Sequence, residues 1–350
     1  MKNKFIILAL LALLGSCKDE NKPFLTLPSY DVQRFDSNAF ERLLYVQTNV
    51  TYTAVSSQPS WCTTEVRQGK DFNYLVIKVT ENISDTERTA EITLTAAGLE
   101  TVIIDVVQGA LSWKLAWSDE FSTNGFIDPA KWKKMPCWEG TGPFDYMSDY
   151  AGLFDVKDGN LILRGILNKG EVPGDTRKYL TAGVYTRGLK SFKSVKTKIE
   201  VSARFESGRG AWAAIWMLPY PEKVLPDRCE IDILEYADFL NTCEQTVHSG
   251  HTQTDPKNPP QVVYPPINRL EYNVYGVEMY DDKVVFFVNG KETMTYPRLN
   301  PEPPYQFWFP KYEYQLMLDM QIGGNSSHPV TDSDLPVAMY VDWVRYYELK

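Results

Sequence analysis

The chain reads Cys229-Glu230-Ile231-Asp232-Ile233-Leu234-Glu235 near its middle. Side chains of a β-strand alternate between its two faces, so Glu230 and Asp232 share one face while the isoleucines enter a core. Glu235 is an odd number of residues from Glu230, and a regular strand would turn it the other way. One extra residue, inserted as a β-bulge, brings Glu235 back beside the other two acids. The stretch therefore predicts a bulged strand with three carboxylates on one face.

Three neighbouring acids repel one another, and their placement suits catalysis better than folding. Glu230 and Glu235 would lie roughly 13 Å apart between Cα atoms. Inclined side chains would close this to the ~5–5.5 Å typical of retaining glycosidases, in which one carboxylate attacks the anomeric carbon and the other protonates the leaving oxygen. Asp232, between them, would help to keep the acid protonated. The alternative is a charged edge strand that faces solvent.

The flanking sequence from residue 110 to 350 is β-rich. Ser194–Phe205 alternates apolar and polar residues, and tight hairpin turns are indicated at 157–160 and at Asn289-Gly290. Asp128-Pro129 is typical of the start of one short helix. About 240 residues of strands with little helix predict two large packed sheets, a β-jelly-roll sandwich.

Residues 28–109 form a second all-β segment. Short runs such as Asn73–Thr80 alternate, and turn signals separate them. This pattern predicts a smaller immunoglobulin-like β-sandwich.

The 229–235 stretch resembles the E-x-D-x-x-E signature of glycoside hydrolase family 16. Three further segments resemble the family's motifs in the right order: Trp117–Phe121, Gly208–Pro219 and Val341–Arg345. The resemblance implies a concanavalin-like fold over 110–350, with Glu230 as nucleophile, Asp232 as helper acid and Glu235 as acid/base, and no cofactor for catalysis. The five-residue spacing is that of the bulged branch, which includes β-1,3-glucanases and galactan-cleaving enzymes.

Several substrate contacts follow with the resemblance. Trp212 and Trp216, on one strand face, look like the sugar platform, although one of them could belong to the core. His248 is expected on the partner strand, in reach of the nucleophile or the sugar. Tyr146 and Trp308 are further candidates, Trp308 in a ring-rich segment that could instead be a packed loop. Relatives often hold a structural Ca²⁺, which Asp342 and the Gly159 backbone would match.

The N-terminal segment resembles the BACON module of Bacteroidetes glycan-degrading proteins. The resemblance rests on Pro59-Ser60-Trp61, on the 82–89 run and on Val107-Gln108. It implies either a carbohydrate-binding module or a spacer that holds the enzyme away from a membrane.

The first residues resemble a lipoprotein leader. Lys2 and Lys4 precede the apolar run 5–14, which is too short to span a bilayer, and Leu14–Cys17 resembles a lipobox. We expect a signal peptide over 1–16, lipidation of Cys17, a tether over 17–27 and an outer-membrane, cell-surface location, since Lys18-Asp19-Glu20 resembles a Bacteroidetes surface-export signal. The alternative is an ordinary secretory signal with a chance cysteine.

Charge and cysteines narrow the partners. A net charge of −9 disfavours nucleic acid. The other cysteines, at 62, 137, 229 and 243, show no zinc-binding spacing. If residues 229–236 pair with 243–250 in a hairpin, residue 243 lies opposite about residue 236. Cys229 and Cys243 are then too far apart for a disulfide, so Cys229 should be a free, buried thiol. We expect a monomer whose partner is a polysaccharide or O-glycan.

The sequence therefore predicts an endo-acting, retaining β-glycoside hydrolase. Cys229 and Ala213 depart from the usual family residues, and the segments Tyr146–Ser148 and Gln245–Ser249 look more like members that cut β-galactosides of host O-glycans. The alternatives are a β-1,3- or mixed-linkage β-glucanase, a transglycosylase, and a non-catalytic surface glycan-binding lipoprotein.

Overall fold

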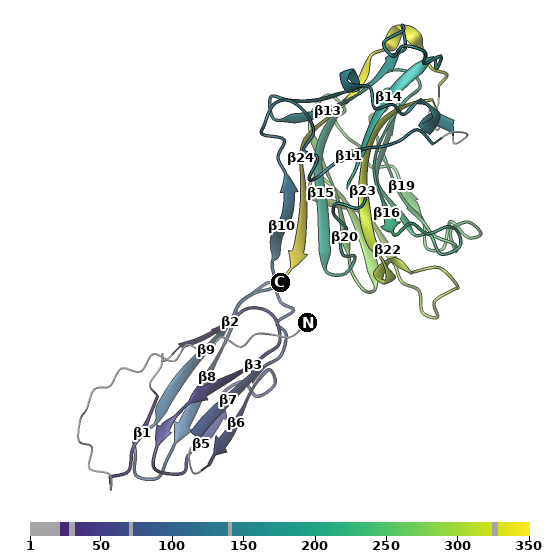
Figure 1. Cartoon of the computed structure of the whole chain (residues 1–350). Coiled ribbons are helices and arrows are strands. Elements are labelled where there is room, and N and C mark those ends of the chain that lie inside the picture. The colour runs from purple at the N-terminus through teal and green to yellow at the C-terminus, as the bar shows by residue number, and fades with distance from the viewer. Residues whose placement is uncertain (1–21, 28–31, 70–72, 139–141, 324–327) are drawn as a thin grey trace. The chain divides into compact units, whose positions relative to one another are not determined.

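The computed structural model describes residues 22–27, 32–69, 73–138, 142–323 and 328–350. The chain divides into two compact units, residues 1–112 with Lys350 and residues 113–349. Both are built almost entirely from β-strands (Figure 1), which confirms the predicted all-β class. The leader, with Cys17, lies outside the described residues. No helix in the described ranges is long and apolar enough to cross a membrane.

The N-terminal unit is a small β-sandwich. One sheet has the order β2-β9-β8-β5 and the other β3-β7-β6, with β1 and β4 as a separate ribbon. Ile77, Ile92 and Ile104 are fully buried between the sheets. Its strands are β1 (Leu25–Thr26), β2 (Val32–Phe35), β3 (Phe40–Tyr45), β4 (Gln47–Thr48), β5 (Thr53–Ser56), β6 (Cys62–Gln68), β7 (Asn73–Val79), β8 (Arg88–Thr95) and β9 (Val102–Gln108).

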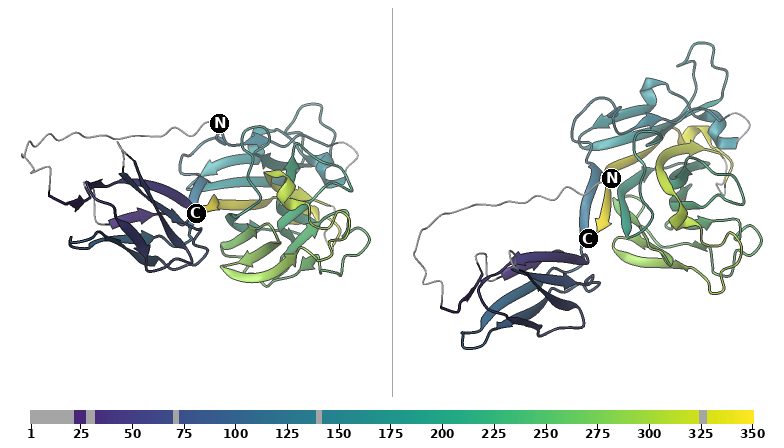
Figure 2. Two further views of the ribbon diagram at one scale, coloured as in Figure 1. Left: turned by 90° about the horizontal axis from the view of Figure 1, so that it is seen from below. Right: turned by 60° about the horizontal axis from the view of Figure 1, so that its bottom comes forward.

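The larger unit is a jelly-roll sandwich, as predicted, shown from two further directions in Figure 2. Its hydrogen-bonded path runs β19-β18-β17-β16-β23-β14-β13-β24-β15-β20-β21-β22, folding into two layers, with β10, β11 and β12 attached at the side. The strands are β10 (Trp113–Asp119), β11 (Lys133–Lys134), β12 (Phe154–Lys157), β13 (Asn160–Leu167), β14 (Tyr179–Tyr185), β15 (Thr197–Glu206), β16 (Ala211–Tyr220), β17 (Glu230–Ala237), β18 (Glu244–His248), β19 (Val262–Val263), β20 (Asn273–Met279), β21 (Lys283–Val288), β22 (Lys291–Pro297), β23 (Glu313–Ile322) and β24 (Val337–Leu349).

Short 3₁₀ turns are the only helical elements among the described residues. They are η1 (Gly142–Tyr146), η2 (Ala151–Leu153), η3 (Phe309–Lys311) and η4 (Asp332–Asp334). The short helix expected after Asp128 is a single turn instead. The Asp128 carboxylate accepts from the Ala130 amide at 2.9 Å, but the chain enters β11 before a second turn forms.

Both predicted hairpin turns are confirmed. Asp158 and Gly159 join β12 to β13, and Asn289 and Gly290 join β21 to β22, each with two consecutive positive φ angles. That backbone shape is the type I′ turn, whose twist matches the twist of the paired strands.

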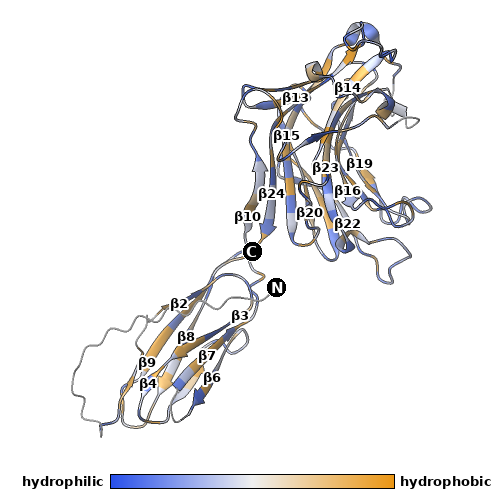
Figure 3. Ribbon diagram, viewed as in Figure 1, coloured by the Kyte–Doolittle hydropathy of each residue, from blue (hydrophilic) through white to orange (hydrophobic). Residues whose placement is uncertain are grey.

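The core of the larger unit lies between the two layers. Alternate residues of β16 and β17, such as Ile215 and Ile231, meet residues of β15, β20 and β21 there. Figure 3 shows the resulting alternation of apolar and polar residues along the strands. The opposite face of β16, β17 and β23 is therefore free to carry polar and aromatic side chains.

Candidate active site

The bulge predicted in the 229–235 stretch is present in β17. Leu234 pairs with Ile215 and Asp232 pairs with Trp216, which leaves Ile233 as the extra residue. Ile231, Ile233 and Leu234 are fully buried. The bulge restores the alternation for the acids, because Glu230, Asp232 and Glu235 all line one cleft.

The cleft lies on the outer face of the layer that contains β16, β17, β18 and β23. Its walls combine three acids from β17, two tryptophans from β16, two residues from β18 and an amide from β23. The lining residues are Phe144, Trp212, Ala214, Trp216, Arg228, Glu230, Asp232, Glu235, Glu244, His248 and Gln321.

Glu230 is held by a cation. Arg228, two residues earlier on the same face, donates from Nη2 to Glu230 Oε2. Burial and the charge of Asp232 raise the Glu230 pKa, whereas Arg228 and His248 act against that rise. The two cations limit this rise, so that the ionised carboxylate that a nucleophile requires is stabilised by Arg228 and His248 against burial.

His248 faces the acids from the neighbouring strand. It pairs in register with Glu230, and its Nε2 lies 3.3 Å from Asp232 Oδ2. Burial alone would lower the His248 pKa, but the contact with Asp232 and the charges of Glu230 and Glu235 outweigh it and raise the pKa to about 9. His248 is therefore a cation at neutral pH and offsets part of the negative charge of the cleft.

Glu235 faces an acid where Glu230 contacts an arginine. Burial raises its pKa, and so do the charges of Asp232 and of Glu244, its register partner on β18. His248 opposes this rise of the Glu235 pKa only in part. A carboxyl that keeps its proton near neutral pH is suited to act as a general acid.

The tryptophan platform is held in place by hydrogen bonds to Asp319 on the neighbouring strand β23. Trp216 Nε1 donates to Asp319 Oδ2 at 2.7 Å, and Gln321 Nε2 donates to Asp319 Oδ1 at 2.5 Å. Asp319 is fully buried, and burial raises its pKa to about 7 against the effect of these two donors. Trp212 is the more open of the two tryptophans, while Trp216 is 6% exposed and packs against Phe144.

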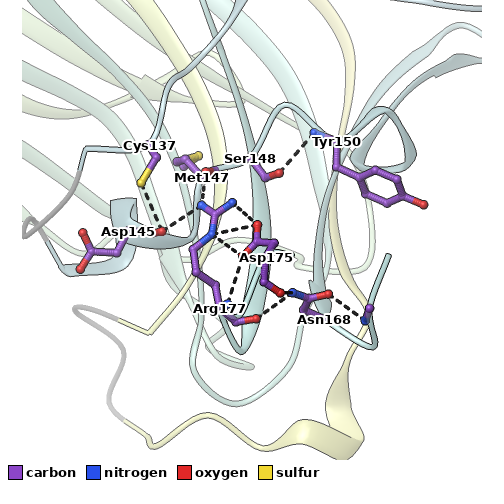
Figure 4. Close-up of polar contacts among 9 residues, drawn as sticks. Cys137, Asp145, Met147, Ser148, Tyr150, Asn168, Asp175 and Arg177 are labelled. Carbon is purple, nitrogen blue, oxygen red and sulfur yellow. Dashed lines mark hydrogen bonds and ion pairs between the residues drawn. The ribbon is translucent and has the colours of Figure 1, made fainter. Parts of the chain in front are cut away.

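Phe144 lines the cleft and belongs to a loop that one arginine holds in place. Figure 4 shows the polar contacts of this arginine, Arg177. Arg177 donates from Nη1 to the carbonyls of Asp145 and Met147, at 3.1 and 2.7 Å. Its Nε is fixed by the Asp175 carboxylate at 3.0 Å. Arg177 therefore fixes the backbone that follows Phe144, at Asp145 and at Met147.

Two predicted sugar contacts are not among the residues that line the cleft. Tyr146 packs edge-on against Tyr179, with ring centroids 5.2 Å apart, because residues two apart in a 3₁₀ turn point in different directions and Phe144 takes the cleft side. Trp308 packs on Tyr305 and beneath the Lys311 ammonium, in the packed loop that was the alternative.

The calcium prediction rests on a single carboxylate. Val341 pairs with Leu161, which brings Asp342 beside the Gly159 hairpin, and Asp342 accepts a 3.4 Å hydrogen bond from Ser202. Among the described residues, no group of three or more His, Cys, Asp or Glu side chains is arranged to hold a metal. Backbone carbonyls would have to supply the remaining ligands, and the site stays a prediction.

The cysteine prediction is confirmed. Glu235 pairs with Glu244, so residue 243 lies opposite residue 236, and Cys229 and Cys243 are both buried and free. Burial raises the pKa of each thiol to about 12, which leaves them unreactive.

Sequence reasoning missed Arg228, Glu244, Phe144 and Gln321. Two of them carried a signal. Arg228 continues the alternation of Glu230 and Asp232, and the register that separates Cys243 from Cys229 also puts Glu244 opposite Glu235. Gln321 could not be found in this way, since its strand pairs with β16 from about 100 residues away.

Two buried glutamates in one cleft, one beside an arginine and the other beside a second acid, together with an aromatic platform define a glycosidase-type site. Residues 175–345 match the family Glycosyl hydrolases family 16. Residues 51–109 match the family BACON, described as a putative binding domain, N-terminal. The chain belongs to glycoside hydrolase family 16 and is a glycoside hydrolase that acts on O-glycosyl bonds.

Relatives of more than one specificity are similar to the chain. A keratan-sulfate endo-1,4-beta-galactosidase of Sphingobacterium multivorum is 31% identical over 241 residues, which are 68% of this chain and 56% of that protein. A beta-glucanase of Rhodothermus marinus is 30% identical over 275 residues, 74% of this chain and 94% of the glucanase. A solved structure from work on endo-acting O-glycanases, expressed by human gut microbiota to initiate mucin breakdown, has a TM-score of 0.57 at 28% identity, covering 68% of this chain and 100% of that one.

Proposed function

We propose that this protein is an endo-acting, retaining β-glycosidase in which Glu230 is the nucleophile and Glu235 the acid/base. The carrying observation is that β17 presents both glutamates to one cleft, with Arg228 beside Glu230 and Glu244 beside Glu235. Arg228 and His248 favour the ionised form of Glu230, and Glu244 favours the protonated form of Glu235. An open cleft lined by two tryptophans suits an internal segment of a chain better than its end.

The chemistry follows from these two states. Ionised Glu230 attacks the anomeric carbon while Glu235 passes its proton to the leaving oxygen, which gives a covalent glycosyl-enzyme. Glu235, now ionised, takes a proton from water, and this water releases the sugar with its configuration retained. Asp232 contacts His248 at 3.3 Å and lies between the glutamates, where it holds the imidazolium and raises the pKa of both acids. No cofactor is required for this reaction.

The substrate proposed first is a β-galactoside of host O-glycans. Similarity to a keratan-sulfate endo-β-galactosidase and to a structure from the O-glycanase work supports it. A β-1,3- or mixed-linkage glucan is the second candidate, supported by the beta-glucanase relative whose length is almost fully covered. Digestion of mucin O-glycans, keratan sulfate, laminarin and mixed-linkage glucan, with products measured by mass, separates them. Products from the glucans alone would end the galactoside proposal.

The roles of the two glutamates can be tested by chemical rescue. Glu230→Ala should lose nearly all activity on polymer, and azide should restore turnover as a glycosyl azide of inverted configuration, because a small anion can enter the vacated position. Glu235→Ala should be rescued on substrates with an activated leaving group, and its azide product should retain configuration. Near-normal polymer hydrolysis by either folded variant would refute the assignment.

We also propose that the protein is a surface lipoprotein. Residues 1–20, which resemble a leader with a lipobox, support this proposal. Cys17→Ala should abolish incorporation of labelled palmitate and release the protein from the membrane fraction. External protease should remove the wild-type protein from intact cells. Unchanged palmitate incorporation in the Cys17 variant would refute this proposal.

A further inference from the structure

Twelve buried side-chain oxygen atoms in the described part of the chain lack a hydrogen-bond partner, and two of them belong to residues that line the cleft. One is Asp232 Oδ2, which lies beside the His248 ring. The other is Gln321 Oε1, in a residue only 1% exposed. A buried carbonyl oxygen without a donor costs free energy, so its retention in a binding cleft points to a ligand that supplies the donor.

The orientation of the Gln321 amide is fixed by its other end. Nε2 donates to Asp319 Oδ1 at 2.5 Å, and Asp319 in turn accepts from Trp216 at 2.7 Å. Asp319 accepts at both of its oxygens, so the Gln321 amide turns its nitrogen to Asp319 and its oxygen away from it.

The position of Gln321 matches the edge of a stacked sugar. Gln321 is the register partner of Trp212, and side chains of paired residues project from the same face of a sheet. A pyranose ring that packs on Trp212 buries its apolar face and leaves its hydroxyl groups around the rim, where they need acceptors. Gln321 offers a rigid acceptor in a neighbouring position.

We propose that Gln321 is a substrate-binding residue that accepts a hydrogen bond from one hydroxyl of the sugar stacked on Trp212. This inference rests on the proposed glycosidase function and deepens it. Asp319 is the positioning residue, since it orients Gln321 and Trp216 without touching the sugar. Specificity for that hydroxyl arises because its absence leaves a buried oxygen unpaired.

The test uses mono-deoxy analogues of N-acetyllactosamine tetrasaccharide and of laminaritetraose, whichever parent the full-length wild-type protein cleaves. With the wild type, kcat/KM should fall roughly 10- to 100-fold on one analogue of the stacked sugar. Gln321→Met should lose a similar factor on the parent sugar and lose almost nothing further on that analogue. Gln321→Asn, which withdraws the oxygen by one methylene, should behave in the same way if the methionine variant does not fold.

Gln315→Met is the matched control. Gln315 lies on the same strand, is fully buried, and has an unpaired Oε1, but it does not line the cleft. This variant should keep the wild-type ranking of the analogues. A folded Gln321 variant that keeps the wild-type discrimination against every analogue would overturn the inference. Retained polymer hydrolysis in Glu230→Ala would instead refute the glycosidase mechanism, so the two failures are distinguishable.

Discussion

Single charges beside Glu235 set the pH range in which a general acid is available. Glu244 faces Glu235 across the β17–β18 pair, with Asp232, Glu230 and His248 as the other charged groups that act on it. Glu244→Gln removes one negative charge, so the Glu235 pKa should fall and the acid should lose its proton at lower pH. The basic limb of the kcat/KM profile should therefore move to lower pH. Glu271→Gln, at an exposed position, should leave the profile unchanged.

The nucleophile is tuned by a charge of opposite sign. Arg228 donates to Glu230 and lowers its pKa against burial and the Asp232 charge. Arg228→Gln removes that cation, so the Glu230 pKa should rise and a higher pH should be needed to ionise it. The acidic limb of the kcat/KM profile should move to higher pH while the basic limb moves less. A profile shifted towards lower pH would contradict the proposed role of Glu230.

Among the structural elements, the loop before β12 depends on one partly buried network of hydrogen bonds around Arg177. Arg177→Ala removes two hydrogen bonds to the carbonyls of Asp145 and Met147 and leaves Asp175 without its cation. Hydrogen bonds of a charged donor contribute about 1.5–3 kcal/mol each, so the free energy of unfolding of the larger unit should fall by about 2 kcal/mol or more. KM should rise because Phe144 loses its support.

The control for this variant is an ion pair in the same unit whose arginine is exposed to the same degree, 29% against 30%, but makes a single contact with a carboxylate. Arg164→Ala breaks a 3.4 Å contact with Asp155 and should lower the free energy of unfolding by less than about 1 kcal/mol, with KM unchanged. Chemical denaturation and steady-state kinetics on one oligosaccharide measure both effects. Equal KM values for the two variants would show that Phe144 does not need the Arg177 network.

The elements that local chemistry determines could be predicted from the sequence. Two type I′ turns and the bulge of β17 follow from residue types and from the alternation of side chains. The aromatic residues of the cleft were harder to predict, because whether Phe144 or Tyr146 points into the cleft depends on the 3₁₀ geometry of η1. The Asp319–Gln321 pair depends on β23 lying beside β16, a pairing between segments about 100 residues apart that no local pattern encodes.

At the scale of the whole molecule, each unit has a main hydrophobic core of its own among the described residues. Ile77 is fully buried in the core of the N-terminal unit, and Phe286 is fully buried in the core of the larger one. Neither cluster includes residues of the other unit. Proteins with two cores need not unfold in one transition, and a cavity in one core acts first on the unit that contains it.

Paired cavity variants test this independence. Ile77→Ala should destabilise the N-terminal unit by about 2–5 kcal/mol, and Phe286→Ala should destabilise the larger unit by about 3–5 kcal/mol. Calorimetry of the full chain should show each variant lowering the temperature of a different transition.

Because every cleft residue belongs to the larger unit, Ile77→Ala should keep wild-type kcat/KM on a soluble oligosaccharide at temperatures below both transitions. If the N-terminal unit binds glycan, Ile77→Ala should lose activity at temperatures at which that unit is unfolded. The loss should be confined to insoluble or densely glycosylated substrates. Equal activity on both substrates would favour a spacer, and reduced activity on the soluble oligosaccharide would show that the two units are energetically coupled.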